Sequence, residues 1–127
     1  MRGTILVVDD DGEMRAIIRA FLEGEGYRVL EASSGDQAMV ILETERLDVA
    51  ILDKEMEGMS GLDLLSYLRH RCPEVRVILI TAFGGRQVAE EAQRRGAHSY
   101  VEKPFRVARI LQEVEGMTRG RQPSSSS

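Results

Sequence analysis

Five short strand-like runs alternate with segments of helical periodicity along this chain, and this alternation restricts the possible folds more than any other feature. The runs span residues 4–8, 27–32, 47–52, 75–80 and 98–102. Short continuous apolar runs are typical of strands buried on both faces. In the segments between them, apolar residues recur every three or four positions, as in amphipathic helices. Five successive strand–helix units predict an α/β fold, a doubly wound parallel sheet of five strands with helices on both faces.

Some of the helical segments also carry recognisable ends. Ser60 and Asp63 predict a capping box at the start of the third helix, and Pro73 follows its end. The first helix is expected to end near Gly24, because glycine commonly follows the last helical turn. Its apolar stripe consists of Met14, Ile17, Ile18, Phe21 and Leu22.

Length and composition are those of one soluble domain. The 127 residues suffice for a single hydrophobic core, and 43% of them are hydrophobic and 30% charged. We expect residues 1–118 to form the domain. Residues 119–127 are rich in Gly, Pro, Gln and Ser, which predicts a disordered tail or a truncated linker.

Composition also excludes several classes of function. A net charge of −4 argues against direct nucleic-acid binding, which requires a basic surface. No apolar run approaches membrane-spanning length, so no membrane association is expected. Cys72 is the only cysteine, which rules out an intramolecular disulfide and favours a reducing, cytoplasmic location. Residues 58–61 lack the glycine spacing of a nucleotide-binding fingerprint, so no organic cofactor is expected.

Polar side chains collect at the ends of the strand-like runs. In a parallel sheet these ends lie on one edge, where ligands bind in open α/β folds. Two carboxylates about 4 Å apart repel by roughly 4 kcal/mol at an effective dielectric near 20, so a cluster of them predicts a bound cation. Mg²⁺ fits, because it prefers oxygen ligands. The residues concerned are Asp9, Asp10, Asp11, Asp53, Thr81 and Lys103.

The same groups fit phosphoryl transfer to an aspartate. A carboxylate can act as the nucleophile and form an aspartyl-phosphate. The oxygens of the transferred group then need neutralising, which the Lys103 ammonium, the Thr81 hydroxyl and the Ala82 N–H could do. Simpler roles remain open for single residues at this point, since Asp10 or Asp11 could cap the first helix.

Four segments together resemble the signature motifs of bacterial response-regulator receiver domains. They are Val7–Asp11, Leu52–Gly61, Thr81–Ala82 and Lys103–Phe105, in the order and spacing of that family. The resemblance extends from Thr4 to Met117. It implies the strand order 2-1-3-4-5 and a place in a two-component phosphorelay, in which a sensor histidine kinase or phosphotransfer protein supplies the phosphoryl group from a phosphohistidine.

The resemblance also implies a role for each residue of the acidic set. Asp53 corresponds to the phosphoacceptor, which also contacts the Mg²⁺ ion. Asp10 corresponds to the direct metal ligand, and Asp9 to a ligand that acts through water. The backbone carbonyl of Glu55 corresponds to the third protein ligand.

Further residues correspond to the phosphoryl-binding and switch positions of the family. Thr81 and Lys103 match the pair that binds the phosphoryl oxygens, and Tyr100 matches an aromatic switch that turns inward when Thr81 moves. The Lys103–Pro104 peptide bond is expected to be cis. Glu55 and Phe83 occupy positions from which side chains control the approach of water to the phosphoryl group.

A receiver domain is a signalling domain rather than a turnover enzyme, although it assists its own phosphorylation and dephosphorylation. The resemblance therefore implies an output surface, formed by the last strands and helices, that contacts an unknown partner or downstream domain. A dimer that forms on phosphorylation is one form this output could take.

A second hypothesis comes from a different class of protein. The segment Val7–Gly12 also resembles the start of haloacid-dehalogenase-type phosphatases, in which Asp9 would be the nucleophile and Asp11 the acid/base. Glu13 replaces the Thr or Val expected there, and the chain leaves no room for a cap domain. Asp53 would have no function in such an enzyme.

Overall fold

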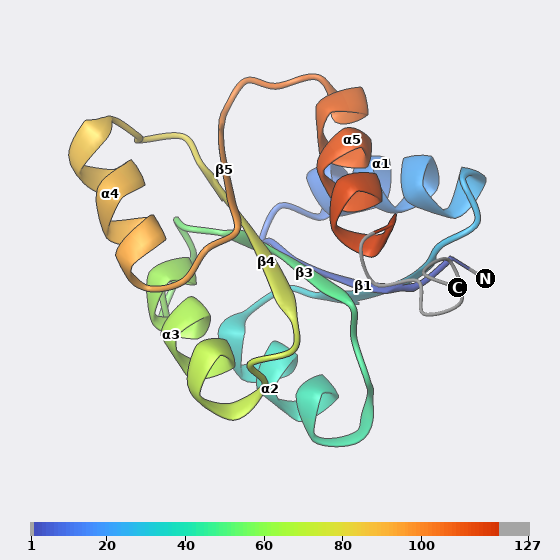
Figure 1. The fold of residues 1–127 in the computed structure, drawn as a ribbon, viewed down its shortest axis with the longest axis horizontal. Coiled ribbons are helices and arrows are strands. Elements are labelled where there is room, and N and C mark those ends of the chain that lie inside the picture. The colour runs from blue at the N-terminus through green and yellow to red at the C-terminus, as the bar shows by residue number, and fades with distance from the viewer. Residues whose placement is uncertain (1, 120–127) are drawn as a thin grey trace.

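All five strand-like runs form strands of one sheet in the computed structural model, which describes residues 2–119 (Figure 1). The strands are parallel, and their order is β2-β1-β3-β4-β5, as expected. They span Thr4–Val8 (β1), Arg28–Ala32 (β2), Val49–Asp53 (β3), Arg76–Thr81 (β4) and Ser99–Glu102 (β5). Asp53 and Thr81 are therefore the last residues of neighbouring strands.

Five helices cover the two faces of this sheet within the described residues. They span Gly12–Gly24 (α1), Gly35–Thr44 (α2), Gly61–Arg71 (α3), Arg86–Arg94 (α4) and Val107–Arg119 (α5). Helices α1 and α5 lie together on one face, and α2 and α3 lie on the other (Figure 1). Helix α4 packs on the same face as α3 through the buried Ala92.

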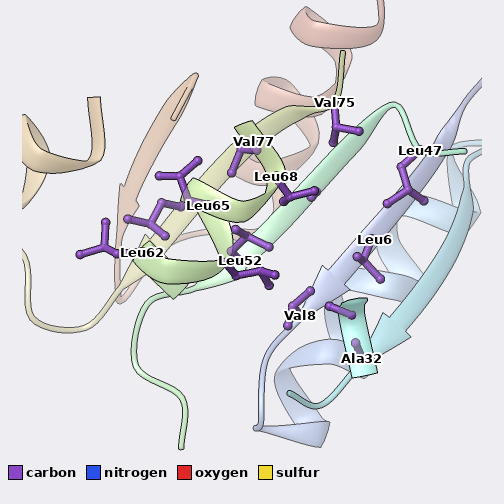
Figure 2. Close-up of a cluster of buried hydrophobic side chains, with 14 of the residues drawn as sticks. Leu6, Val8, Ala32, Leu47, Leu52, Leu62, Leu65, Leu68, Val75 and Val77 are labelled. Carbon is purple, nitrogen blue, oxygen red and sulfur yellow. The ribbon is translucent and has the colours of Figure 1, made fainter. Parts of the chain in front are cut away.

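The alternation of side chains along the strands divides the interior into two cores. Ile5 and Val7 of β1 contact the core beneath α1 and α5, whereas Leu6 and Val8 contact the core beneath α2 and α3 (Figure 2). Successive strand residues point to opposite faces, so the central positions of a strand covered on both sides are apolar without alternation. This is why β1 reads as a continuous apolar run. Each such buried side chain contributes about 1.5–3 kcal/mol to folding.

The structure differs from the expected boundaries and faces in two places. Of the apolar stripe on α1, Ile18 and Leu22 are buried, but Ile17 and Phe21 are 52% and 41% exposed because no element within residues 2–119 covers that side of the helix. Helix α5 continues to Arg119, one residue into the expected tail. The rest of that tail, 120–127, lies outside the described residues. None of the described helices has both the length and the apolar character needed to cross a bilayer.

Candidate functional site

Three carboxylates converge at the carboxyl edge of the sheet. Asp53 ends β3, and Asp9 and Asp10 directly follow β1, the neighbouring strand. One ligand oxygen from each of the three lies within 4.8 Å of the other two. Asp9 and Asp53 are almost fully buried, at 2% and 3% exposure, whereas Asp10 is exposed to solvent. The structure therefore brings together the three aspartates that the sequence assigned to a metal site.

Lys103 provides the positive charge that faces this cluster. Its Nζ lies 3.5 Å from Asp53 Oδ1 and 3.9 Å from Asp9 Oδ2. The residue follows β5 directly and precedes a cis peptide bond to Pro104, as expected. Two buried carboxylates thus share one ammonium, which leaves a net negative charge in a poorly solvated place.

The net negative charge and the poor solvation at this site shift the pKa of Asp53. The pKa of its carboxyl is raised from 3.8 to about 7, mainly by burial and then by the charge of Asp9, while the Lys103 ammonium opposes both effects. The backbone N–H of Glu55 also donates a hydrogen bond to Asp53 Oδ1 at 3.4 Å, which favours the ionised form.

The donor set fits a hard divalent cation. Carboxylate oxygens are the ligands that Mg²⁺ prefers, and a cation would remove the repulsion between Asp9 and Asp53 that the lysine leaves uncompensated. The exposed side of the cluster, at Asp10, leaves access for the waters that Mg²⁺ retains.

Asp11 has a structural role in this arrangement. Its Oδ1 accepts hydrogen bonds from the backbone N–H groups of Glu13 and Met14, at 3.0 and 3.3 Å, so Asp11 is the N-cap of α1. Its own N–H donates to Asp9 Oδ1 at 2.9 Å and orients that carboxylate. The question left open by the sequence is settled here for Asp11, and a side chain engaged in this way is a poor candidate for the acid/base of a phosphatase.

Gly61 fixes the backbone that carries Asp53. Its N–H donates to the Lys54 carbonyl at 3.0 Å, and a Cβ at this position would overlap the Asp53 carbonyl and lie 2.8 Å from Lys54 Cα. Because these neighbours are backbone atoms rather than flexible side chains, they cannot move aside without moving Asp53. The first turn of α3 is thus packed directly against the strand end that presents the carboxylate.

We expect Gly61→Ala to lower the free energy of unfolding by about 2 kcal/mol or more, since overpacking against backbone has no inexpensive relaxation. Chemical denaturation of both proteins measures the change. Gly116→Ala is the matched control, because among residues 2–119 no atom outside its own stretch of α5 lies within 4 Å of the added Cβ. That variant should gain about 0.5–1 kcal/mol from reduced backbone entropy. Equal stabilities of the two variants would contradict the close packing described for Gly61.

The Thr81 hydroxyl and the Ala82 N–H, at the end of β4, both donate hydrogen bonds to the side chain of Glu55. Thr81 Oγ1 donates to Glu55 Oε2 at 2.5 Å, and the Ala82 N–H donates to Glu55 Oε1 at 2.9 Å. Lys54 Nζ lies 3.4 Å from the same Oε2. Burial alone would raise the pKa of Glu55, but the hydrogen bonds from Thr81 and Ala82 hold it below its usual value.

Tyr100 is tied to the loop after β4. Its hydroxyl donates to Glu102 Oε2 at 3.0 Å, and the Gly85 N–H donates to both of these side chains, at 3.2 and 3.1 Å. A Cβ on Gly84 would overlap the Tyr100 hydroxyl and the Glu102 carboxylate, so glycine is required for this approach. Burial and the hydrogen bond to Glu102 raise the pKa of Tyr100. The hydroxyl is thus directed to Glu102 and Gly85, in an arrangement distinct from the inward one expected on activation.

Sequence reasoning missed two features of this edge. The side chain of Glu55 was assigned only to the approach of water, yet it occupies the donors of Thr81 and Ala82. Glu102 was not singled out, although it holds Tyr100. One property of the sequence could have indicated the role of the Glu55 side chain. Lys54 and Lys103 are the only lysines in the sequence, and both lie next to carboxylates of this site.

Comparison with known sequences places this site in a family. The sequence model described as "Response regulator receiver domain" matches residues 5–115. The chain is 33% identical over 115 residues to sporulation initiation phosphotransferase F of Bacillus subtilis, an alignment that covers 91% of this chain and 93% of that protein. It is 34% identical over 113 residues to the nitrogen assimilation regulatory protein NtrX of Azorhizobium caulinodans. That alignment covers 87% of this chain but 25% of the relative, so the chain spans about a quarter of NtrX.

Comparison with solved structures leads to the same family as comparison with known sequences. The receiver domain of the Francisella response regulator 1452 superposes with a TM-score of 0.89 at 26% identity, covering 94% of this chain and 99% of that one. The receiver domain of NtrX from Brucella abortus gives a TM-score of 0.84 at 32% identity, covering 91% and 98%. These findings give no support to the phosphatase alternative. The chain belongs to the response regulator receiver domains, the signalling domains of two-component phosphorelays.

Proposed function

We propose that Asp53 accepts the phosphoryl group in this domain, and that the donor is the phosphohistidine of a sensor histidine kinase or phosphotransfer protein. One observation carries the assignment. Asp53 is the member of the acidic cluster that is buried as the last residue of a strand and lies 3.5 Å from the Lys103 ammonium, and its strand pairs with β4, whose end carries the Thr81 hydroxyl and the Ala82 N–H. Nucleophile, charge partner and hydrogen-bond donors therefore lie on one sheet edge.

The transfer itself needs an ionised Asp53. One carboxylate oxygen attacks phosphorus, a P–O bond forms, and the P–N bond to the donor imidazole breaks with its electron pair remaining on nitrogen. The Lys103 ammonium stabilises the ionised carboxylate before transfer and a phosphoryl oxygen after it. Asp11 holds Asp9 in place, and the packing of Gly61 holds the Asp53 backbone.

Receiver domains bind Mg²⁺ at an acidic cluster, and we assign the corresponding ligands here to Asp9, Asp10, Asp53 and the backbone carbonyl of Glu55. When bound, the ion neutralises charge on the carboxylates and on the phosphoryl oxygens. Asp9 and Asp53 are preorganised for it by burial, whereas the exposed Asp10 has more freedom to adjust.

The same geometry supports a switch. We expect the Thr81 hydroxyl and the Ala82 N–H, which now donate to Glu55, to bind phosphoryl oxygens after transfer, and a shift of Thr81 toward them would open space for Tyr100 to turn inward. That turn would break the hydrogen bonds from Tyr100 to Glu102 and from Gly85 to Tyr100, releasing the loop before α4. We place the output surface on these last strands and helices, where a partner, a downstream domain or a second copy would read the change.

Treatment with a small acyl phosphate and Mg²⁺ tests this function. We expect one phosphoryl group per chain, seen as a single mass shift, and loss of the shift when EDTA replaces Mg²⁺. Peptide mapping after borohydride reduction should place the modification on Asp53. An adduct mapped to Asp9 instead would support the phosphatase-type chemistry, and the absence of any adduct would refute the acceptor role of this domain.

A further inference from the structure

The carboxylate of Glu55 occupies the donors that the proposed function reserves for the phosphoryl group. Each of its oxygens accepts one hydrogen bond, Oε2 from the Thr81 hydroxyl at 2.5 Å and Oε1 from the Ala82 N–H at 2.9 Å. The planar Glu55 carboxylate thus occupies the two hydrogen-bond donors that would otherwise bind two oxygens of the tetrahedral phosphoryl group. Both are charge-assisted hydrogen bonds, which are among the stronger ones in proteins.

The two donors cannot serve both anions at once. A hydroxyl has one hydrogen and a backbone amide has one, so each of them donates a single full hydrogen bond. The Thr81 oxygen already accepts a hydrogen bond from the Phe83 N–H at 3.0 Å, and the residue is fully buried, so no water can supply its hydroxyl with a further proton to donate. Occupation by Glu55 and occupation by a phosphoryl oxygen therefore exclude each other.

The Glu55 side chain has a route out of this position. It lies on the loop that follows β3, its side chain is 29% exposed, and its other charge partner, Lys54, is 23% exposed. Rotation toward solvent would leave the Ala82 N–H, which lies at the surface, free for another anion. The carboxylate is therefore removable without unfolding any helix or strand.

We propose that the Glu55 side chain is an intramolecular competitor for the phosphoryl-binding donors, so that phosphorylation of Asp53 must displace it from Thr81 and Ala82. This inference rests on the proposed function, because it takes these donors to be the phosphoryl site. It assigns the side chain a role separate from that of the Glu55 backbone carbonyl. The competitor holds the unphosphorylated arrangement of the β4 end and slows acceptance of a phosphoryl group.

The test compares Glu55→Ala with wild type and with Glu57→Ala. Glu57 is a matched control, because it carries the same charge, lies two residues away on the same loop and is exposed. With a small acyl phosphate and Mg²⁺, the initial rate of adduct formation should rise about tenfold in Glu55→Ala, as expected for removing charge-assisted competition. In Glu57→Ala it should change by less than about twofold, since surface charges act weakly.

Amide NMR of Ala82 gives a second readout that does not depend on the reaction. In wild type, its proton should resonate downfield because it donates to a carboxylate, and it should move upfield in Glu55→Ala but not in Glu57→Ala. After phosphorylation, wild type and Glu55→Ala should share one Ala82 position, because the same phosphoryl oxygen is then the acceptor.

The outcomes separate this inference from the function on which it rests. An adduct that forms equally fast in wild type and Glu55→Ala overturns the competition and leaves the acceptor role of Asp53 intact. Equal acceleration in Glu55→Ala and Glu57→Ala also overturns it, because the effect would then be one of net charge. An unmoved Ala82 amide in Glu55→Ala overturns the occupancy itself. Failure of all three proteins to form an adduct would refute the proposed function instead.

Discussion

Asp53→Asn is expected to abolish the phosphoryl adduct, with a loss of at least about 100-fold in the rate of its formation. The amide has nearly the shape of the carboxylate and can still accept the hydrogen bond from the Glu55 N–H, so the fold should be retained. It lacks the anionic oxygen that attacks phosphorus, and removing the nucleophile removes a step that no neighbouring group can supply in the same geometry. The measurement is the mass shift after treatment with a small acyl phosphate and Mg²⁺.

Asp11→Asn is the informative control, because Asp11 lies in the same sequence motif and is the helix cap rather than a reactive group. Asparagine is also a good N-cap, so this variant should keep its adduct and most of its stability. The opposite pattern, with the adduct lost in Asp11→Asn and kept in Asp53→Asn, would restore the phosphatase hypothesis. Circular dichroism on each variant separates loss of reaction from loss of fold.

Asp53→Asn is also expected to be the more stable protein when metal is absent and the pH is high. The folded-state pKa of Asp53 is about 7, against an ordinary value of 3.8. Between these values the folded chain holds a proton that the unfolded chain releases, so stability falls as the pH rises from about 4 to about 7. Each unit of raised pKa corresponds to about 1.4 kcal/mol. We expect the variant to exceed wild type by about 1–3 kcal/mol at pH 8 in EDTA.

This prediction is tested by measuring the melting temperatures of wild type and Asp53→Asn in EDTA at several pH values. Near pH 4 the carboxyl of Asp53 is protonated in wild type, so the two melting temperatures should approach each other. At pH 8 they should differ by roughly 4 °C or more, the shift expected for 1 kcal/mol in a domain of this size. Asp36→Asn changes an exposed aspartate that is not part of the acidic cluster, and it should stay within about 0.5 kcal/mol of wild type at both pH values.

Adding Mg²⁺ tests the electrostatic repulsion at Asp53 from the opposite direction, because the bound ion removes it. At about 100 times its dissociation constant, a ligand that binds only the folded state stabilises it by roughly 2.7 kcal/mol. Wild type should gain this amount, while Asp53→Asn, which lacks one ligand and most of the repulsion, should gain much less. A difference between the two proteins that is independent of both pH and Mg²⁺ would mean that Asp53 carries no electrostatic strain.

Much of the fold was predictable because the pattern of each segment is local. β1 is apolar from Ile5 to Val8 since both of its faces are covered, and Ser60 caps α3 through a hydrogen bond to the residue three positions later. The convergence of Asp9, Asp53 and Lys103 also followed from the sequence, because parallel strands bring their carboxyl ends to one edge. The exposure of Ile17 and Phe21 did not follow, since helical spacing does not tell which part of a stripe is covered.

What the sequence determined by itself was therefore the order of the elements, the class of the fold and the residue types at the edge of the sheet. The tertiary structure alone decided how the charges there are paired. Glu55, on the loop after β3, and Thr81, at the end of β4, are 26 residues apart, and their hydrogen bond depends on the register of β3 against β4 and on a side-chain rotation. Local patterns report burial and periodicity, whereas the partner of a polar side chain depends on distances of a few ångströms between distant segments. That is why Asp53 could be named from the sequence, and why the carboxylate that occupies its neighbouring donors could not.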